Sequence, residues 1–173
     1  QTMALPGREE ARTLILAEFE DYIYCCTHLS LTEEDRMKSL DILKAFAISY
    51  KKPLFWAGDM NTEPESDFIK ELQKDFRILS DSKQHTFPAP APKETIDYVV
   101  AFKQNDKGFA LVSSEVVNEP VASDHRPIVV ELRTAEKADK IFRTKPYLQN
   151  PVGNGMTVMW ETTVPAYCWV EYG

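Results

Sequence analysis

The chain has 173 residues, of which 43% are hydrophobic and 27% are charged, so it suits one globular domain, or one domain and a piece of another. Its 20 basic and 27 acidic residues give a formal net charge of -7 at pH 7, which disfavours a protein that holds nucleic acid by broad attraction to phosphates. A small phosphorylated substrate is compatible with this balance, and divalent cations would then supply positive charge at the site.

The cysteines and the apolar runs exclude two further classes, a cysteine metal site and a membrane-spanning chain. Cys25, Cys26 and Cys168 lack the spacing of metal ligands, and we expect the adjacent pair to be buried thiols. No apolar run reaches the ~18 residues of a transmembrane helix, and no leader is visible. The chain starts at Gln1 rather than Met and ends within a strand-like run, so we expect a fragment of a longer protein.

The first elements in chain order are a hairpin, a helix and a buried strand. The run 13–26 predicts two strands joined by a turn at Glu20-Asp21. Residues 31–49 have apolar residues near helical spacing and acidic residues in the first turn, which predicts a helix with Thr32 as its N-cap. The short apolar run 53–58 then predicts a fully buried strand.

A second short helix, a proline-rich loop and three further strands follow. The helix is expected at 66–76, and the loop at 85–95, which has too many prolines for regular structure. Strands are expected at 96–102, 109–117 and 128–133, the last two joined by a turn-rich segment. Strands that alternate with helices predict an α/β layered domain.

The character of the sequence changes after Arg133. Residues 134–144 form a charged connector, and residues 145–173 alternate apolar and polar side chains around a proline turn. We therefore expect a first domain over 1–133, a linker over 134–144 and a partial β-sandwich over 145–173.

Four polar clusters each lie at the end of a predicted strand: Thr27-His28, residues 58–61, residues 96–98 and residues 123–125. Loops that leave strand ends in layered α/β folds can bring such groups together. Hydrolysis of a phosphate ester needs a carboxylate for the water, donors for the phosphate oxygens and a divalent cation. Taken singly, each cluster is more often an ordinary capped turn, so the prediction depends on their joint occurrence.

The clusters resemble the successive motifs of a known family, the endonuclease/exonuclease/phosphatase superfamily. The strings that carry the resemblance are THL at 27–29, GDMN at 58–61, TFP at 86–88, IDYV at 96–99 and SDHRP at 123–127. The resemblance covers residues 7–133 and implies the C-terminal half of that family's four-layer α/β (α+β) sandwich.

The resemblance also implies a role for each site residue. Asp59 positions or activates the attacking water, and Asn61 and His28 contact the phosphate. Asp97 pairs with His125, which contacts the scissile phosphate. A buried carboxylate such as that of Asp97 also needs a partner on physical grounds, and His125 supplies one.

Two further residues are assigned by the resemblance alone. Arg12 resembles an arginine near the family's site, and Asp124 contributes to the metal site. Mg²⁺ is the expected ion, with Mn²⁺ or Ca²⁺ as alternatives. The family's principal Glu ligand would lie upstream of Gln1, so we expect one uncovered apolar face and little activity in the fragment alone.

The tail carries a second resemblance. The strings KPYLQNP, TVMW and VEYG are similar to the start of the fibronectin-like N-terminal domain of purple acid phosphatases. That likeness implies a parent protein with a second phosphoesterase domain, and it favours a secreted or periplasmic location.

The function predicted from the sequence is a metal-dependent phosphoesterase, active in the complete parent protein, that hydrolyses a phosphodiester or phosphomonoester. The alternative is a non-catalytic relative that uses the same cleft to bind a ligand or partner. A small phosphorylated molecule is the expected substrate, and the charge does not favour nucleic acid.

Overall fold

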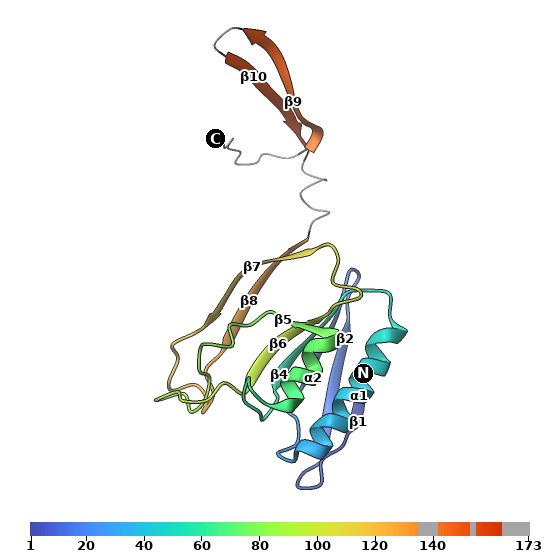
Figure 1. Ribbon diagram of the computed structural model, residues 1–173, viewed down its shortest axis with the longest axis vertical. Coiled ribbons are helices and arrows are strands. Elements are labelled where there is room, and N and C mark those ends of the chain that lie inside the picture. The colour runs from blue at the N-terminus through green and yellow to red at the C-terminus, as the bar shows by residue number, and fades with distance from the viewer. Residues whose placement is uncertain (135–141, 153–154, 164–173) are drawn as a thin grey trace. The chain divides into compact units, whose positions relative to one another are not determined.

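The computed structural model describes residues 1–134, 142–152 and 155–163 (Figure 1). The chain divides into two compact units, Gln1–Lys107 with Leu111–Leu132, and Gly108–Ala110 with Arg133–Gly173. Most of the linker predicted at 134–144 lies outside the described residues. No helix in the described part of the chain is long and apolar enough to cross a membrane.

The first unit is built on a mixed six-stranded sheet with the order β1-β2-β3-β4-β6-β5. β3 and β4 run parallel, and the other neighbours in this sheet pair antiparallel. The strands are β1 (Thr2–Leu5), β2 (Arg12–Glu18), β3 (Ile23–Thr27), β4 (Leu54–Asp59), β5 (Phe76–Ile78) and β6 (Asp97–Phe102).

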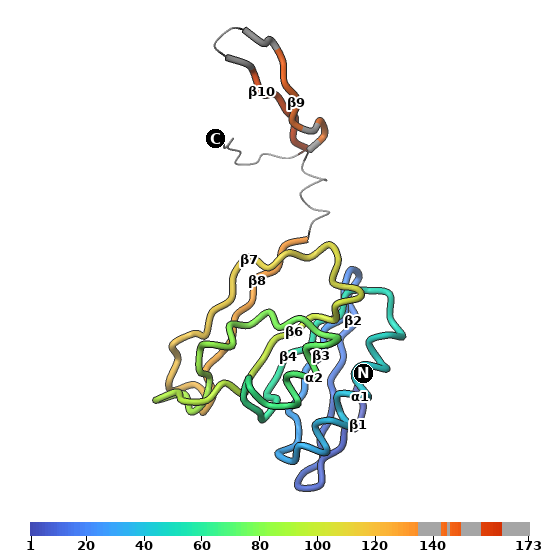
Figure 2. The backbone as a smooth tube through the Cα atoms, in the orientation of Figure 1, coloured from blue at the N-terminus to red at the C-terminus, as the bar shows by residue number. Residues whose placement is uncertain are grey.

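Two helices, α1 (Glu33–Ser49) and α2 (Asp67–Asp75), lie on the same side of this sheet (Figures 1 and 2). Their buried residues pack with the sheet into one hydrophobic core, in which Trp56 is fully buried. Ser66 caps α2 by accepting a hydrogen bond from the backbone of Ile69 at 3.2 Å, which satisfies a free amide of the first turn.

Thr32 is the N-cap of α1, as predicted, but it does not cap the helix through its side chain. Thr32 has the extended backbone of an N-cap, but its side chain makes no capping hydrogen bond and donates instead to Glu9. Arg8 binds the carboxylates of Glu34 and Asp35 in the first turn, each at 2.9 Å. Arg8 therefore links Glu34 and Asp35 to the β1–β2 connection. The same two carboxylates also lie at the positive end of the helix dipole.

The strands β2 and β3 alternate buried and exposed residues because successive side chains of a strand point to opposite faces. Leu14 and Cys25 belong to the core, whereas Ile15 is 57% and Tyr24 is 38% exposed. Cys26 is also exposed, so the prediction of two buried thiols is correct for Cys25 and wrong for Cys26.

A two-stranded sheet joins β7 (Phe109–Val116) and β8 (Ile128–Thr134). In the second unit, β9 (Phe142–Val152) and β10 (Gly155–Thr162) pair as an antiparallel hairpin. β9 begins at Phe142, within the stretch predicted as linker, and residues 164–173 lie outside the described residues.

The predicted hairpin, both helices and the strands corresponding to β4, β6, β7 and β8 are confirmed within a few residues. Two strands were not predicted. β1 is a short edge strand, and β5 follows α2 directly at Phe76, where the sequence predicted the end of a helix.

Candidate active site

The sheet topology brings three of the polar clusters to one edge. β3 and β4 are parallel, so the residues that follow Thr27 and those at Asp59 leave the sheet at the same end. β6 is antiparallel to β4, and its first residue, Asp97, is the register partner of Asp59. His28 directly follows β3, and His125 reaches the same edge from the segment between β7 and β8.

The two carboxylate oxygens of Asp59 have different partners. Oδ1 accepts a hydrogen bond from the backbone N–H of Asn61 at 2.7 Å. Oδ2 lies 3.2 Å from His28 Nε2 and 3.9 Å from His125 Nε2. One oxygen is thus held by the turn, while the other faces two imidazole rings.

The surroundings of Asp59 raise its pKa above the ordinary value. Burial of the carboxyl group is the main cause, and the charge of Asp97 acts in the same direction. The Asn61 N–H and the charges of His28 and His125 oppose the shift without cancelling it. A carboxylate with a raised pKa is a stronger base than one in water.

His125 and Asp97 form a hydrogen-bonded pair, with 2.8 Å between His125 Nδ1 and Asp97 Oδ2. A carboxylate can only accept, so Nδ1 carries the proton and Nε2 is left toward Asp59. The ring also packs against Phe87, with 4.8 Å between centroids. Burial lowers the pKa of His125, but the hydrogen bond and charge of Asp97, with the charges of Asp59 and Asp124, raise it above the ordinary value.

The turn after β4 is tied to the segment after β3. Asn61 has a positive φ of 50°, which asparagine tolerates better than most residues, and its Nδ2 donates to Leu29 O at 2.9 Å. Leu29 N in turn donates to Asp59 O at 2.9 Å. These two bonds hold His28 beside Asp59, and they use one of the two amide hydrogens that Asn61 could offer to a phosphate.

Asp59, Asp97 and His125 each offer a ligand atom within 4.8 Å of the others, so they form a potential metal-binding group. Two carboxylates and an imidazole are donors that suit a divalent cation. Asp124 is not a member of this group among the described residues; its side chain is exposed, with 3.3 Å between Ser123 Oγ and Asp124 Oδ1. The assignment of Asp124 to the metal site therefore stays a prediction.

Arg12 is buried in the structure, but its described ion pair is with Glu10, at 3.3 Å between Arg12 Nη2 and Glu10 Oε2. Its Nε has no hydrogen-bond partner among the described residues. A contact between Arg12 and a phosphate stays a prediction as well.

Sequence reasoning missed Arg36, which supports the segment that carries His28. Arg36 is 8% exposed, and its Nη1 donates to Ser30 O at 3.1 Å and to Leu31 O at 2.7 Å. Ser30 Oγ donates to Glu9 Oε2 at 2.8 Å on the other side of the segment. The available signal was its position, four residues before the buried Leu40 on the face of α1 that enters the core.

Comparison with known proteins shows the family of the chain. Residues 6–125 match the model of the Endonuclease/Exonuclease/phosphatase family. The chain belongs to this family. None of the curated proteins compared with the chain matches it.

Several solved structures have the same fold as this chain. The endonuclease/exonuclease/phosphatase of Bacteroides vulgatus is similar with a TM-score of 0.59 and 21% identity, over 72% of this chain and 56% of its own. The mannosyl-6-phosphatase of Bacteroides thetaiotaomicron gives 0.61 and 15% identity, over 71% and 57%. The human Nocturnin catalytic domain gives 0.58 and 17% identity, over 78% and 58%.

The solved structures and the family match show different properties of the chain. At such identities the structures show the fold alone, and the chain spans little more than half the length of each. Members of the family are phosphoric ester hydrolases. The family match ends at residue 125, so it does not bear on the likeness of residues 145–173 to a purple acid phosphatase domain.

Proposed function

We propose that this chain is the C-terminal part of a metal-dependent phosphoesterase that hydrolyses a phosphodiester or phosphomonoester. The observation that carries the proposal is the sheet edge at which Asp59 faces both His28 and the Asp97–His125 pair. Family membership supplies the reaction class, and the whole activity belongs to the complete parent protein.

In the proposed reaction, water attacks the phosphorus atom and a new P–O bond forms. Asp59, with its raised pKa, accepts a proton from that water through Oδ2. The bond to the ester oxygen breaks with its electron pair on that oxygen, and the leaving alkoxide takes up a proton from solvent to give the alcohol. His28 and the second amide hydrogen of Asn61 contact the non-bridging oxygens, together with Arg12.

His125 stabilises the negative charge of the phosphate. Its pairing with Asp97 fixes the ring through Nδ1 and favours the protonated imidazole, whose Nε2–H can then donate to a phosphate oxygen. A bound divalent cation would offset the remaining charge of the transition state. We assign it to Asp124 and a Glu upstream of Gln1, with Mg²⁺ as the expected ion and the Asp59, Asp97 and His125 group as the alternative donors.

For the tail, we propose that residues 145–173 begin a fibronectin-like domain of the purple acid phosphatase type. The proposal rests on the sequence strings; the β9–β10 pair is antiparallel, as strands of such a sandwich are, but this pairing is not specific to it. The domain boundaries that we propose are 1–133, 134–144 and 145–173.

The proposed function is tested in the complete parent protein with a chromogenic phosphodiester and with Mg²⁺ added or removed by chelation. We expect hydrolysis that depends on the metal. Asp124→Asn should weaken the apparent Mg²⁺ affinity about tenfold or more, whereas Glu115→Gln, at an exposed position on β7, should leave it unchanged. Metal-independent hydrolysis, or none, would contradict the proposal.

A further inference from the structure

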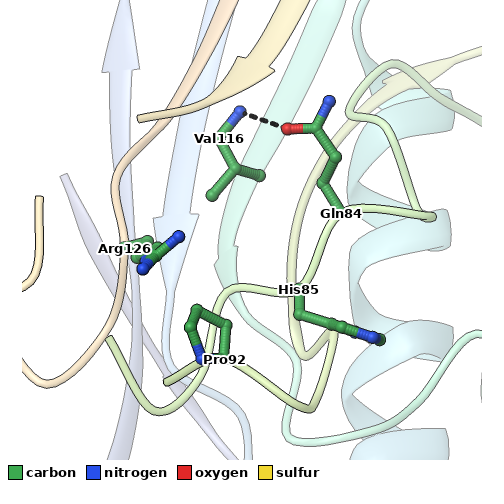
Figure 3. Close-up of a pocket in the computed structure, with 5 residues that line it drawn as sticks. All are labelled: Gln84, His85, Pro92, Val116 and Arg126. Atoms are coloured by element: carbon green, nitrogen blue, oxygen red, sulfur yellow. Dashed lines mark hydrogen bonds between the residues drawn. The ribbon is translucent and has the colours of Figure 1, made fainter. Parts of the chain in front are cut away.

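A cavity lies apart from the active-site cluster. Its volume is about 270 Å³, close to the lower end of small-molecule sites, and it shares no lining residue with the cluster of His28, Asp59, Asp97 and His125. Figure 3 shows the residues that line it, which are Gln84, His85, Pro92, Val116 and Arg126.

The lining of this cavity carries one permanent charge, the Arg126 guanidinium, and no carboxylate. Arg126 Nε donates to Ala89 O at 2.8 Å, which fixes the plane of the group. Its terminal amino groups have no hydrogen-bond partner among the described residues. In Figure 3 Arg126 faces Gln84 and Val116 across the cavity, and the His85 ring is turned away from it. A fixed guanidinium with free donors favours a phosphate-like oxyanion.

The walls of the cavity are held by hydrogen bonds without a ligand. Val116 N donates to Gln84 Oε1 at 3.0 Å, and Gln84 Nε2 donates to Asp81 Oδ2 at 3.0 Å. Arg126 N donates to Thr86 O at 2.8 Å. A ligand would therefore order little of the protein on binding, which lowers the entropic cost of occupying the site.

The cavity and the active site share one loop. Residues 86–89 bond to both sides of His125, since Ala89 N donates to Asp124 O at 2.7 Å and Arg126 N donates to Thr86 O. Phe87, in the same loop, packs on the His125 ring. The backbone that carries His125 thus also forms a wall of the cavity.

We propose that this cavity binds a phosphate group other than the one handled at His125. Arg126 is its principal recognition residue, and Pro92 and Val116 give it an apolar wall for the organic part of a phosphorylated ligand. Anion binding here does not depend on the proposed function. Its use as a subsite for a second phosphate of the substrate does rest on that function.

The test is a titration of this chain with inorganic phosphate, followed by ¹⁵N NMR at the Arg126 Nε–H and the Gln84 and His85 amides. We expect saturable shifts. Arg126→Gln should weaken binding at least about tenfold, since a charged hydrogen bond is lost. Lys93→Gln is the matched control, because it removes the same charge from an exposed position next to Pro92, on a different loop from Arg126, and binding should stay within about twofold.

Two results would overturn the proposal. Equal weakening by Arg126→Gln and Lys93→Gln would show general attraction to positive charge. Loss of the shifts in His125→Ala, with Arg126→Gln unaffected, would place the phosphate at the active site.

Tighter binding of glycerol 2-phosphate than of inorganic phosphate would assign the organic part to the apolar wall, and equal binding would assign recognition to the phosphate alone. Intact binding here in a parent protein without phosphoesterase activity would overturn only the proposed function.

Discussion

Asp59 and His125 are held by different parts of the chain, yet their environments act together. The Asp59 carboxylate is fixed through Oδ1 by its own turn, and the His125 ring is fixed through Nδ1 by Asp97. The other atoms of these two groups, Asp59 Oδ2 and His125 Nε2, lie 3.9 Å apart, and Asp59 Oδ2 is also 3.2 Å from His28 Nε2. In the proposed reaction these three atoms contact the water and the phosphate.

The Asp97–His125 pair should behave as one unit in the parent enzyme. Asp97→Asn should stabilise the protonated imidazole less and hold the ring less firmly, so we expect turnover to fall. His125→Ala should lower turnover by about a hundredfold. The double variant should lose much less than the product of the two single effects, because both remove the same interaction. Steady-state rates of the four proteins measure this coupling; independent effects would show that Asp97 does not act through His125.

At the scale of elements, the close approach of β3 and β4 depends on a glycine. Gly58 has a φ of +145°, and a Cβ at this position would lie 1.8 Å from the backbone oxygen of Thr27. Neither the conformation nor the space admits another side chain. The two strands that carry His28 and Asp59 can therefore pair only with glycine at this position.

Gly58→Ala should destabilise the chain by about 3 kcal/mol or more, since backbone must move to relieve the contact. Gly108→Ala is the matched control: Gly108 also has a positive φ, of +100°, but nothing lies within 4 Å of the Cβ position. Gly108→Ala should lower the free energy of unfolding by only about 1 kcal/mol, because it introduces backbone strain without a steric contact. Urea unfolding of the three proteins separates these effects, and equal losses would refute the steric argument.

Arg36 should support the His28 segment from within α1. Arg36→Met keeps much of the side-chain volume but leaves the Ser30 and Leu31 carbonyls without this donor, so we expect a loss of about 2 kcal/mol in unfolding free energy. Arg36→Lys should recover part of the loss because it retains a charged donor.

A positioning role for Arg36 also predicts a change that simple destabilisation would not cause. The NMR signals of the His28 ring should shift in Arg36→Met under conditions where the chain is fully folded. Lys38→Met, on the exposed side of the same helix, should leave them in place. Unchanged His28 signals in Arg36→Met would limit Arg36 to a structural role.

For the whole molecule, most of the elements and their order could be predicted because they depend on local patterns. Apolar runs followed by polar clusters marked the strand ends, and Asp97 within an apolar strand pointed to a partner. Cys26 was predicted to be buried because the run around it is apolar, but strand alternation places it on the exposed face.

Features that depend on contacts between distant residues could not be predicted. The pairing of Arg8 with Asp35, the support of Ser30 and Leu31 by Arg36 and the cavity at Arg126 each require segments that local patterns do not place together. β5 escaped prediction for the same reason, because three residues acquire strand geometry only by pairing with β6. The assignment of Asp124 and Arg12 came from family likeness and still depends on experiment.

In the proposed mechanism Asp59 serves as the base of a phosphoesterase, and Asp59→Asn in the parent protein tests this role most directly. The amide has the same volume and lacks basicity, so folding should stay near normal while turnover of a generic phosphodiester with Mg²⁺ falls at least about a hundredfold. Asp67→Asn, an exposed residue at the start of α2, should leave turnover unchanged. Wild-type turnover in a folded Asp59→Asn variant would contradict the account.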